Sequence, residues 1–135
     1  KGSLVPLCPP SVLLNTGTLM PLLGLGTFRL QSQEDSYNAV GAALTAGYRA
    51  FDTAAVCHNE AQLGHALSCL LPKHDLSRED VYITSKLGPK DQGYKARDGC
   101  LRSLEHMTNA QLNNCSIIYI GKFYYMNNST YILRF

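Results

Sequence analysis

The sequence lacks the features that would point to a membrane, a metal ion or a nucleic acid. None of its apolar runs approaches the roughly 18–20 residues that a membrane-spanning helix needs. It contains neither a CxxC nor an HxxxH pair, so no zinc site is expected. Its 12 basic and 10 acidic side chains are scattered and leave a formal charge of only +2, which argues against a nucleic acid or an anionic membrane surface as partner.

The chain also lacks signs of export. Pro6, Pro9 and Pro10 interrupt the one apolar stretch near its beginning, which therefore does not resemble a signal peptide. The five cysteines are an odd number without paired spacing, and this pattern favours reduced thiols over a closed set of disulfides. We therefore expect a cytoplasmic protein, with residues 1–11 as a flexible arm and residues 12–135 as one domain.

What the sequence does contain is an alternation of strand and helix signals. A short hairpin is expected from residues 12–14 and 18–20. The spacing of apolar residues predicts helices over residues 32–46, 59–71 and 91–107, the last with Leu101 and Leu104 turned inward. Apolar runs predict strands over residues 22–28, 48–51, 81–86 and 116–120. Such alternation is typical of parallel strands with right-handed crossovers, and so of an α/β fold.

Residues able to do chemistry stand at the ends of three predicted strands. Gly26 and Thr27 lie at the end of the first, Asp52 follows the second, and Lys86 ends the third. A carboxylate directly after a buried strand costs free energy of folding unless it is paired. It is therefore expected to cap a helix, to pair with a cation or to take part in a reaction. Because the carboxyl ends of parallel strands share one edge, we expect Asp52 and Lys86 to meet there. The pair is either a salt bridge that only holds two strand ends together or part of a reaction site.

One stretch of the chain resembles a known family signature. Residues 47–64 read GYRAFDTAAVCHNEAQLG, and this pattern resembles the signature of the aldo-keto reductases. Residues 25–28 (LGTF) before it and residues 83–87 (ITSKL) after it agree in kind and spacing. So does the N-terminal hairpin, which in that family plugs the bottom of the barrel. The resemblance covers about residues 12–105, and residues 106–135 diverge from the family.

The resemblance implies a (β/α)8 barrel that uses NADPH to reduce a small aldehyde or ketone to an alcohol. In that family a hydride passes from the nicotinamide to the carbonyl carbon, while a tyrosine hydroxyl protonates the oxygen. A lysine ammonium paired to an aspartate favours the phenolate that remains. On matching positions Asp52 is the aspartate and Lys86 the lysine. Gly26, Thr27 and Asp52 lie where the cofactor approaches.

Two positions depart from the family pattern. The tyrosine, five residues after the aspartate, is replaced by Cys57, whose thiol is shorter than a phenol. Cys57 is then either a catalytic acid in the tyrosine's place or a small buried residue. No histidine or acid lies at a spacing that would activate it as a nucleophile. The family's histidine, at the end of the fourth strand, aligns with Gly121.

The length of the chain sets the remaining expectations. A complete barrel of this type needs about 250 residues, so 135 residues are expected to form a partial barrel, the hairpin followed by about four βα units. The first and fourth strands would then be open edges through which the chain could self-associate. We therefore expect a truncated NADP(H)-dependent oxidoreductase with weak or no activity or, alternatively, a non-catalytic isoform that acts through protein–protein association.

Overall fold

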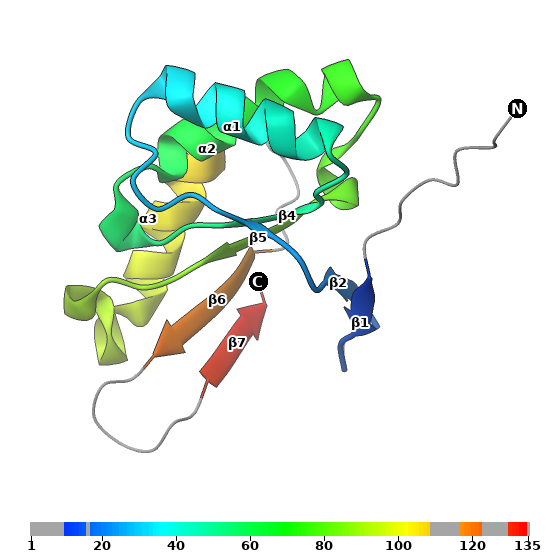
Figure 1. Ribbon diagram of the computed structural model, residues 1–135. Helices are drawn as coiled ribbons and strands as arrows, with labels where there is room; N and C mark the ends of the chain where they lie inside the picture. The colour runs from blue at the N-terminus through cyan, green and yellow to red at the C-terminus, as the bar shows by residue number, and fades with distance from the viewer. Residues whose placement is uncertain (1–9, 16, 109–116, 123–129, 135) are drawn as a thin grey trace, which may run out of the picture.

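The computed structural model describes residues 10–15, 17–108, 117–122 and 130–134, which contain two β-sheets (Figure 1). The smaller sheet is an antiparallel hairpin of β1 (Ser11–Leu13) and β2 (Leu19–Pro21). The larger sheet has the strand order β3-β4-β5-β6-β7, with the bounds Leu25–Gly26, Ala50–Asp52, Tyr82–Ser85, Ile117–Lys122 and Thr130–Arg134. Strands β3 to β6 run parallel, which confirms the α/β fold.

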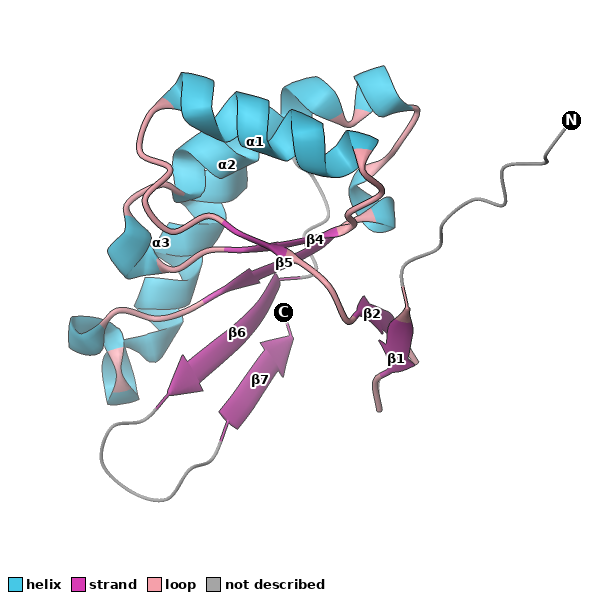
Figure 2. Cartoon of the chain, in the orientation of Figure 1, coloured by secondary structure: helices cyan, strands magenta, loops and turns pink. Residues whose placement is uncertain are grey.

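Three α-helices connect the parallel strands and cover one face of the larger sheet (Figures 1 and 2). They are α1 (Gln33–Thr45), α2 (Glu60–Leu70) and α3 (Ala96–Thr108). Ser32 caps the start of α1, because its hydroxyl accepts a hydrogen bond of 2.9 Å from the Asp35 N–H. Gly47 follows the end of α1 with a φ of 92°, a conformation that glycine adopts readily and that turns the chain back toward β4.

The main core lies between the helices and the sheet. Phe51 of β4 and Ile83 of β5 are each 1% exposed and pack in one cluster with Leu63 and Leu67 of α2. Helices α2 and α3 approach closely at Gly64, where an added Cβ would lie 2.5 Å from the carbonyl oxygen of Met107. This layer of apolar side chains fixes the strands that carry the predicted site.

A second, smaller cluster joins the hairpin to the sheet. Ala50 and Tyr82, the first residues of β4 and β5, are buried against Leu14 and Met20. The hairpin region therefore packs at the N-terminal ends of these strands, at the far end from Asp52 and Lys86. This is the position that the family resemblance implied.

The third helix differs from the prediction in its start and its buried face. Two 3-10 turns, Pro89–Asp91 and Gly93–Lys95, precede α3, so the helix begins at Ala96 rather than at residue 91. Leu101 is 44% exposed, whereas Cys100 and Met107 are each 1% exposed. The buried face runs through Cys100, Ser103 and Met107, which recur at helical spacing, and Leu101 lies one position off that face. The expectation that Leu101 points inward was therefore wrong; Leu104 does pack against the core.

The larger sheet is open, as a partial barrel requires. Strands β3 and β7 form its two edges. The expectation that the fourth parallel strand is an edge was wrong, because β7 pairs with β6 in antiparallel fashion.

The predicted arm lies outside the described residues except for residues 10–11, as do Cys8 and Cys115. None of the described helices has the length and apolar character required to cross a membrane.

Candidate active site

The ends of three parallel strands place the predicted site residues in one row. In the register of the sheet, Gly26 of β3 lies beside Asp52 of β4, and Asp52 lies beside Thr84 of β5. Asp52 is the last residue of its strand rather than part of the following turn. Lys86 comes directly after β5. The sequence-based expectation that these residues meet at the carboxyl ends of the parallel strands is confirmed.

Asp52 and Lys86 form a close ion pair at this edge. The Lys86 Nζ lies 2.6 Å from Asp52 Oδ1 and 2.7 Å from Oδ2, and it also donates to the Thr53 carbonyl oxygen at 3.0 Å. Thr84 donates its hydroxyl to the same Oδ1 at 2.6 Å. The Lys86 side chain is 41% exposed and that of Asp52 is 46% exposed. The pair is therefore held in a fixed geometry and remains open to a ligand.

Gly26 and Thr27 contribute in different ways. Thr27 is 2% exposed, and both its N–H and its hydroxyl donate to the Asp52 carbonyl oxygen at 2.9 Å. Its side chain thus fixes the loop after β3. Gly26 is exposed, and no atom lies within 4 Å of the place where a Cβ would stand. The open backbone at Gly26, rather than the Thr27 hydroxyl, is the part of this strand end that a cofactor could approach.

Cys57 ends a short 3-10 turn, Ala55–Cys57, and is 8% exposed. Its carbonyl oxygen accepts from the Gln31 Nε2 at 2.8 Å, and its N–H donates to the Ala54 carbonyl at 2.9 Å. His58, which follows it, has a φ of 52°. This burial agrees with the interpretation of Cys57 as a small buried residue.

Two residues within the family signature support the site, although the sequence did not identify them as functional. Asn59 is 1% exposed; its Oδ1 accepts from the Thr53 hydroxyl at 2.7 Å, and its Nδ2 donates to the Thr27 carbonyl at 2.6 Å. Glu60 is 4% exposed, and its Oε1 accepts from the Ser85 hydroxyl at 2.5 Å. The signal that could have identified them is an adjacent amide and carboxylate at the start of a helix whose other buried residues carry no polar side chain.

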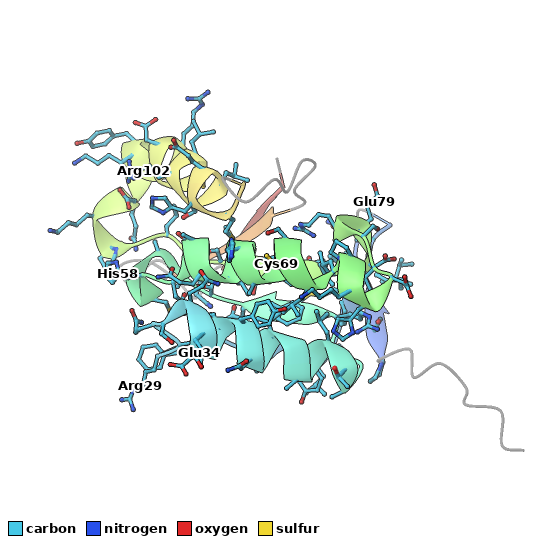
Figure 3. All side chains as sticks on the ribbon, turned by 90° about the horizontal axis from the view of Figure 1, so that it is seen from above. Arg29, Glu34, His58, Cys69, Glu79 and Arg102 are labelled. Carbon is cyan, nitrogen blue, oxygen red and sulfur yellow. The ribbon has the colours of Figure 1, made fainter. Side chains whose placement is uncertain are left out.

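A cleft of about 450 Å³ opens between α2 and α3, and its lining includes neither Asp52 nor Lys86. Figure 3 shows His58 and Arg102 at the same end of the helix layer. Arg102 pairs with Asp91, and His106 Nδ1 lies 3.8 Å from Glu60 Oε2. Within the described residues no group of three or more His, Cys, Asp or Glu side chains could hold a metal ion.

Comparison with known proteins agrees with this geometry. Residues 22–130 match the model of the aldo/keto reductase family. An aldo-keto reductase of Mycobacterium sp. (strain MCS) is 44% identical over 99 residues, which cover 73% of this chain and 33% of that protein.

Solved structures give the same result. An aldo-keto reductase from a Medee basin deep-sea metagenome library matches with a TM-score of 0.63 and 42% identity, over 72% of this chain and 34% of its own. The aldose reductase of Schistosoma japonicum matches with a TM-score of 0.66 and 37% identity, over 73% and 33% of the two chains. This chain thus spans about a third of the length of these relatives, whose fold is the (β/α)8 barrel. It belongs to the aldo/keto reductase family.

Proposed function

We propose that this chain carries part of the reaction site of an oxidoreductase that uses NADPH to reduce aldehydes or ketones to alcohols. The observation that supports this most is the half-exposed Asp52–Lys86 pair at the carboxyl ends of β4 and β5. A buried structural salt bridge would not leave both side chains more than a third exposed. Barrel enzymes hold their reacting groups at the carboxyl ends of their parallel strands, and the charged pair lies at these ends.

The residues present suit the nicotinamide end of such a cofactor. Gly26 leaves the backbone open beside Asp52, and the ion pair stands next to that opening. When bound, the reduced nicotinamide supplies a hydride to the carbonyl carbon. Lys86 then stabilises negative charge on the group that gives a proton to the carbonyl oxygen, while Asp52 holds the ammonium in place.

The group that gives the proton is the weak point of this site. The family resemblance puts Cys57 where a tyrosine is expected, and Cys57 is buried in its turn. A thiol is several Å shorter than a phenol, and a misplacement of about 1 Å can cost on the order of a hundredfold in rate. We therefore propose that carbonyl reduction by this chain is weak or absent, although the Asp52–Lys86 pair is intact.

Cofactor binding tests the proposal. NADPH fluorescence is followed as the cofactor is titrated with the wild-type chain and with the Lys86→Met and Asp52→Asn variants. Saturable binding that weakens in both variants is expected, and Lys90→Met, which changes an exposed lysine in the following loop, serves as the matched control. No saturable binding by the wild-type chain at high micromolar cofactor would overturn the proposal.

A second candidate function is association through the open edge at β3. Leu22 and Leu23 lie just before this edge strand, separated from it by Gly24, and are 66% and 51% exposed. Exposed apolar side chains beside an unpaired strand favour pairing with another chain. Sedimentation over a range of concentrations should then show a larger species that is lost in Leu23→Lys. A monomer at every concentration would exclude self-association.

A further inference from the structure

Two adjacent residues at the start of α2 contact all three strand ends that build the site. Asn59 bonds to the loop after β3 through Thr27 and to the end of β4 through Thr53. Glu60 bonds to the end of β5 through Ser85. Each of these partners is the immediate neighbour of a predicted site residue: Gly26, Asp52 and Lys86 respectively.

We propose that Asn59 and Glu60 are positioning residues that fix the Asp52–Lys86 pair. The inference rests on the proposed function only in treating that pair as the reaction site. The two side chains act from the helix side of the sheet, whereas the pair lies at its opposite, open face. They therefore influence the pair through the backbone at the strand ends rather than by contact with a substrate.

Asn59 has the shorter connection to Lys86. The Asn59 Oδ1 accepts from the Thr53 hydroxyl at 2.7 Å, and the Thr53 carbonyl oxygen accepts from Lys86 Nζ at 3.0 Å. A single residue thus joins the buried amide to the ammonium. The Asn59 Nδ2 also donates to the carbonyl oxygens of Thr27 and Leu30, at 2.6 Å and 3.1 Å. Removing this amide would take one donor from each carbonyl and leave only the Leu30 N–H on Thr27, at 3.1 Å, and the Ser36 hydroxyl on Leu30, at 3.5 Å. It would also take the acceptor from the buried Thr53 hydroxyl, so the backbone at Thr27 and Thr53 would be held less firmly.

Glu60 restrains the strand on the other side of the pair. Ser85 is 0% exposed and directly precedes Lys86, and alternation along the chain sends the two side chains to opposite faces. The Ser85–Glu60 hydrogen bond therefore fixes the backbone from which the Lys86 side chain extends. The second carboxylate oxygen lies 3.8 Å from His106 Nδ1, at the wall of the cleft between α2 and α3.

Selective acylation of lysines measures the position of Lys86 directly. The ammonium of Lys86 donates three hydrogen bonds in the wild-type structure, so its amine should react slowly. Limiting acetic anhydride is added to the folded chain, and the modification of Lys86 is measured by mass spectrometry relative to the exposed Lys90 and Lys95. Circular dichroism under the same conditions confirms that each variant is folded.

The variants separate positioning from general stability. Asn59→Ala and Glu60→Ala are expected to raise the relative labelling of Lys86 several-fold. Glu60→Gln, which keeps an acceptor for the Ser85 hydroxyl, should return it to near the wild-type value. Gln62→Ala is the matched control, because this amide on the same helix donates only a long bond of 3.4 Å, to the Gln31 carbonyl oxygen.

A further variant tests the same connection if Asn59→Ala does not fold. Thr53→Val replaces the hydroxyl that bonds Asn59 with a methyl group and keeps the carbonyl that bonds Lys86, and it should also raise the labelling. Wild-type labelling of Lys86 in folded Thr53→Val and folded Glu60→Ala would overturn the inference. The labelling requires no cofactor, so a failure to bind NADPH would contradict the proposed function alone.

Discussion

The two faces of the larger sheet differ in what they do, and the difference is set residue by residue along each strand. On β4, Phe51 is 1% exposed among the helices, while the side chain of its neighbour Asp52 is 46% exposed on the other side. On β5, Ile83 belongs to the same core as Phe51, and Thr84 bonds to Asp52. Because successive side chains of a strand point to opposite faces, one strand supplies both the core and the site.

The helix-covered face should contribute more to the free energy of unfolding than the open face. The helix-covered face buries apolar area, which is the dominant favourable term in folding. The open face carries an exposed ion pair, and exposed pairs contribute little. Substitutions in the core on the first face should therefore change stability, and those of the Asp52–Lys86 pair on the second should change ligand binding with little change in stability.

Phe51→Ala should have the largest effect on the helix-covered face. Loss of a buried phenylalanine costs about 3–5 kcal/mol, a large share of the 5–15 kcal/mol that stabilises an ordinary domain. Urea unfolding followed by circular dichroism should show a much lower midpoint or no folded baseline. A change of less than about 1 kcal/mol, the size expected of a surface site, would break the comparison between the faces.

Gly64→Ala should have the next largest effect. An added Cβ would stand 2.5 Å from the Met107 carbonyl oxygen, so α2 and α3 must move apart, at a cost of about 1–3 kcal/mol. Gly41→Ala in α1 is the matched control, since its Cβ would make an ordinary contact of 3.6 Å with Leu70. That variant should be neutral or gain up to about 1 kcal/mol from helix propensity. Equal thermal midpoints for both variants would contradict the close packing of the two helices.

Lys86→Met tests the open face. Both members of the ion pair are more than a third exposed, so the free energy of unfolding should fall by less than about 1 kcal/mol. The same urea experiment measures it. A loss as large as that expected of Phe51→Ala would mean that the pair is a structural salt bridge.

The smallest effect is expected at the opposite end of β5, in the turn before the strand. Hydrogen bonds from the Ser77 N–H and hydroxyl to Asp80 Oδ2, at 2.7 and 3.0 Å, hold the pKa of Asp80 below its usual range. A lowered pKa stabilises the folded chain above the usual value of about 4, and this contribution disappears as the pH falls through the lower pKa of the folded state. The stability difference between wild type and Asp80→Asn should therefore shrink as the pH is lowered from 7 into the acid range. A difference that is independent of pH would contradict this.

Sequence reasoning predicted the parts of this molecule that depend on local pattern. The strand ends with Gly26, Asp52 and Lys86 followed from the alternation of elements and the parallel-sheet rule, and the structure brings them together. Sequence reasoning did not predict β7. Among the described elements this strand follows β6 without an intervening helix and pairs with it in antiparallel fashion, which departs from the expected alternation of strand and helix.

It also did not identify the residues that act across the chain. Asn59 is a helix-start residue by sequence, and only the fold brings its side chain to Thr27, 32 residues earlier. Local pattern carries no information about such distant partners. The assignment of Cys57 to the tyrosine position remains a prediction from the resemblance.

The reduction of an aldehyde by the wild-type chain and by Cys57→Tyr is the most direct test of the central claim, that the ion pair is intact and the proton donor is missing. The loss of NADPH absorbance is followed with both chains at a saturating aldehyde concentration. A phenol at position 57 should raise the rate well above that of the wild type, and the gain should be lost in the double variant that also carries Lys86→Met. Equal rates for the wild type and Cys57→Tyr would contradict the claim.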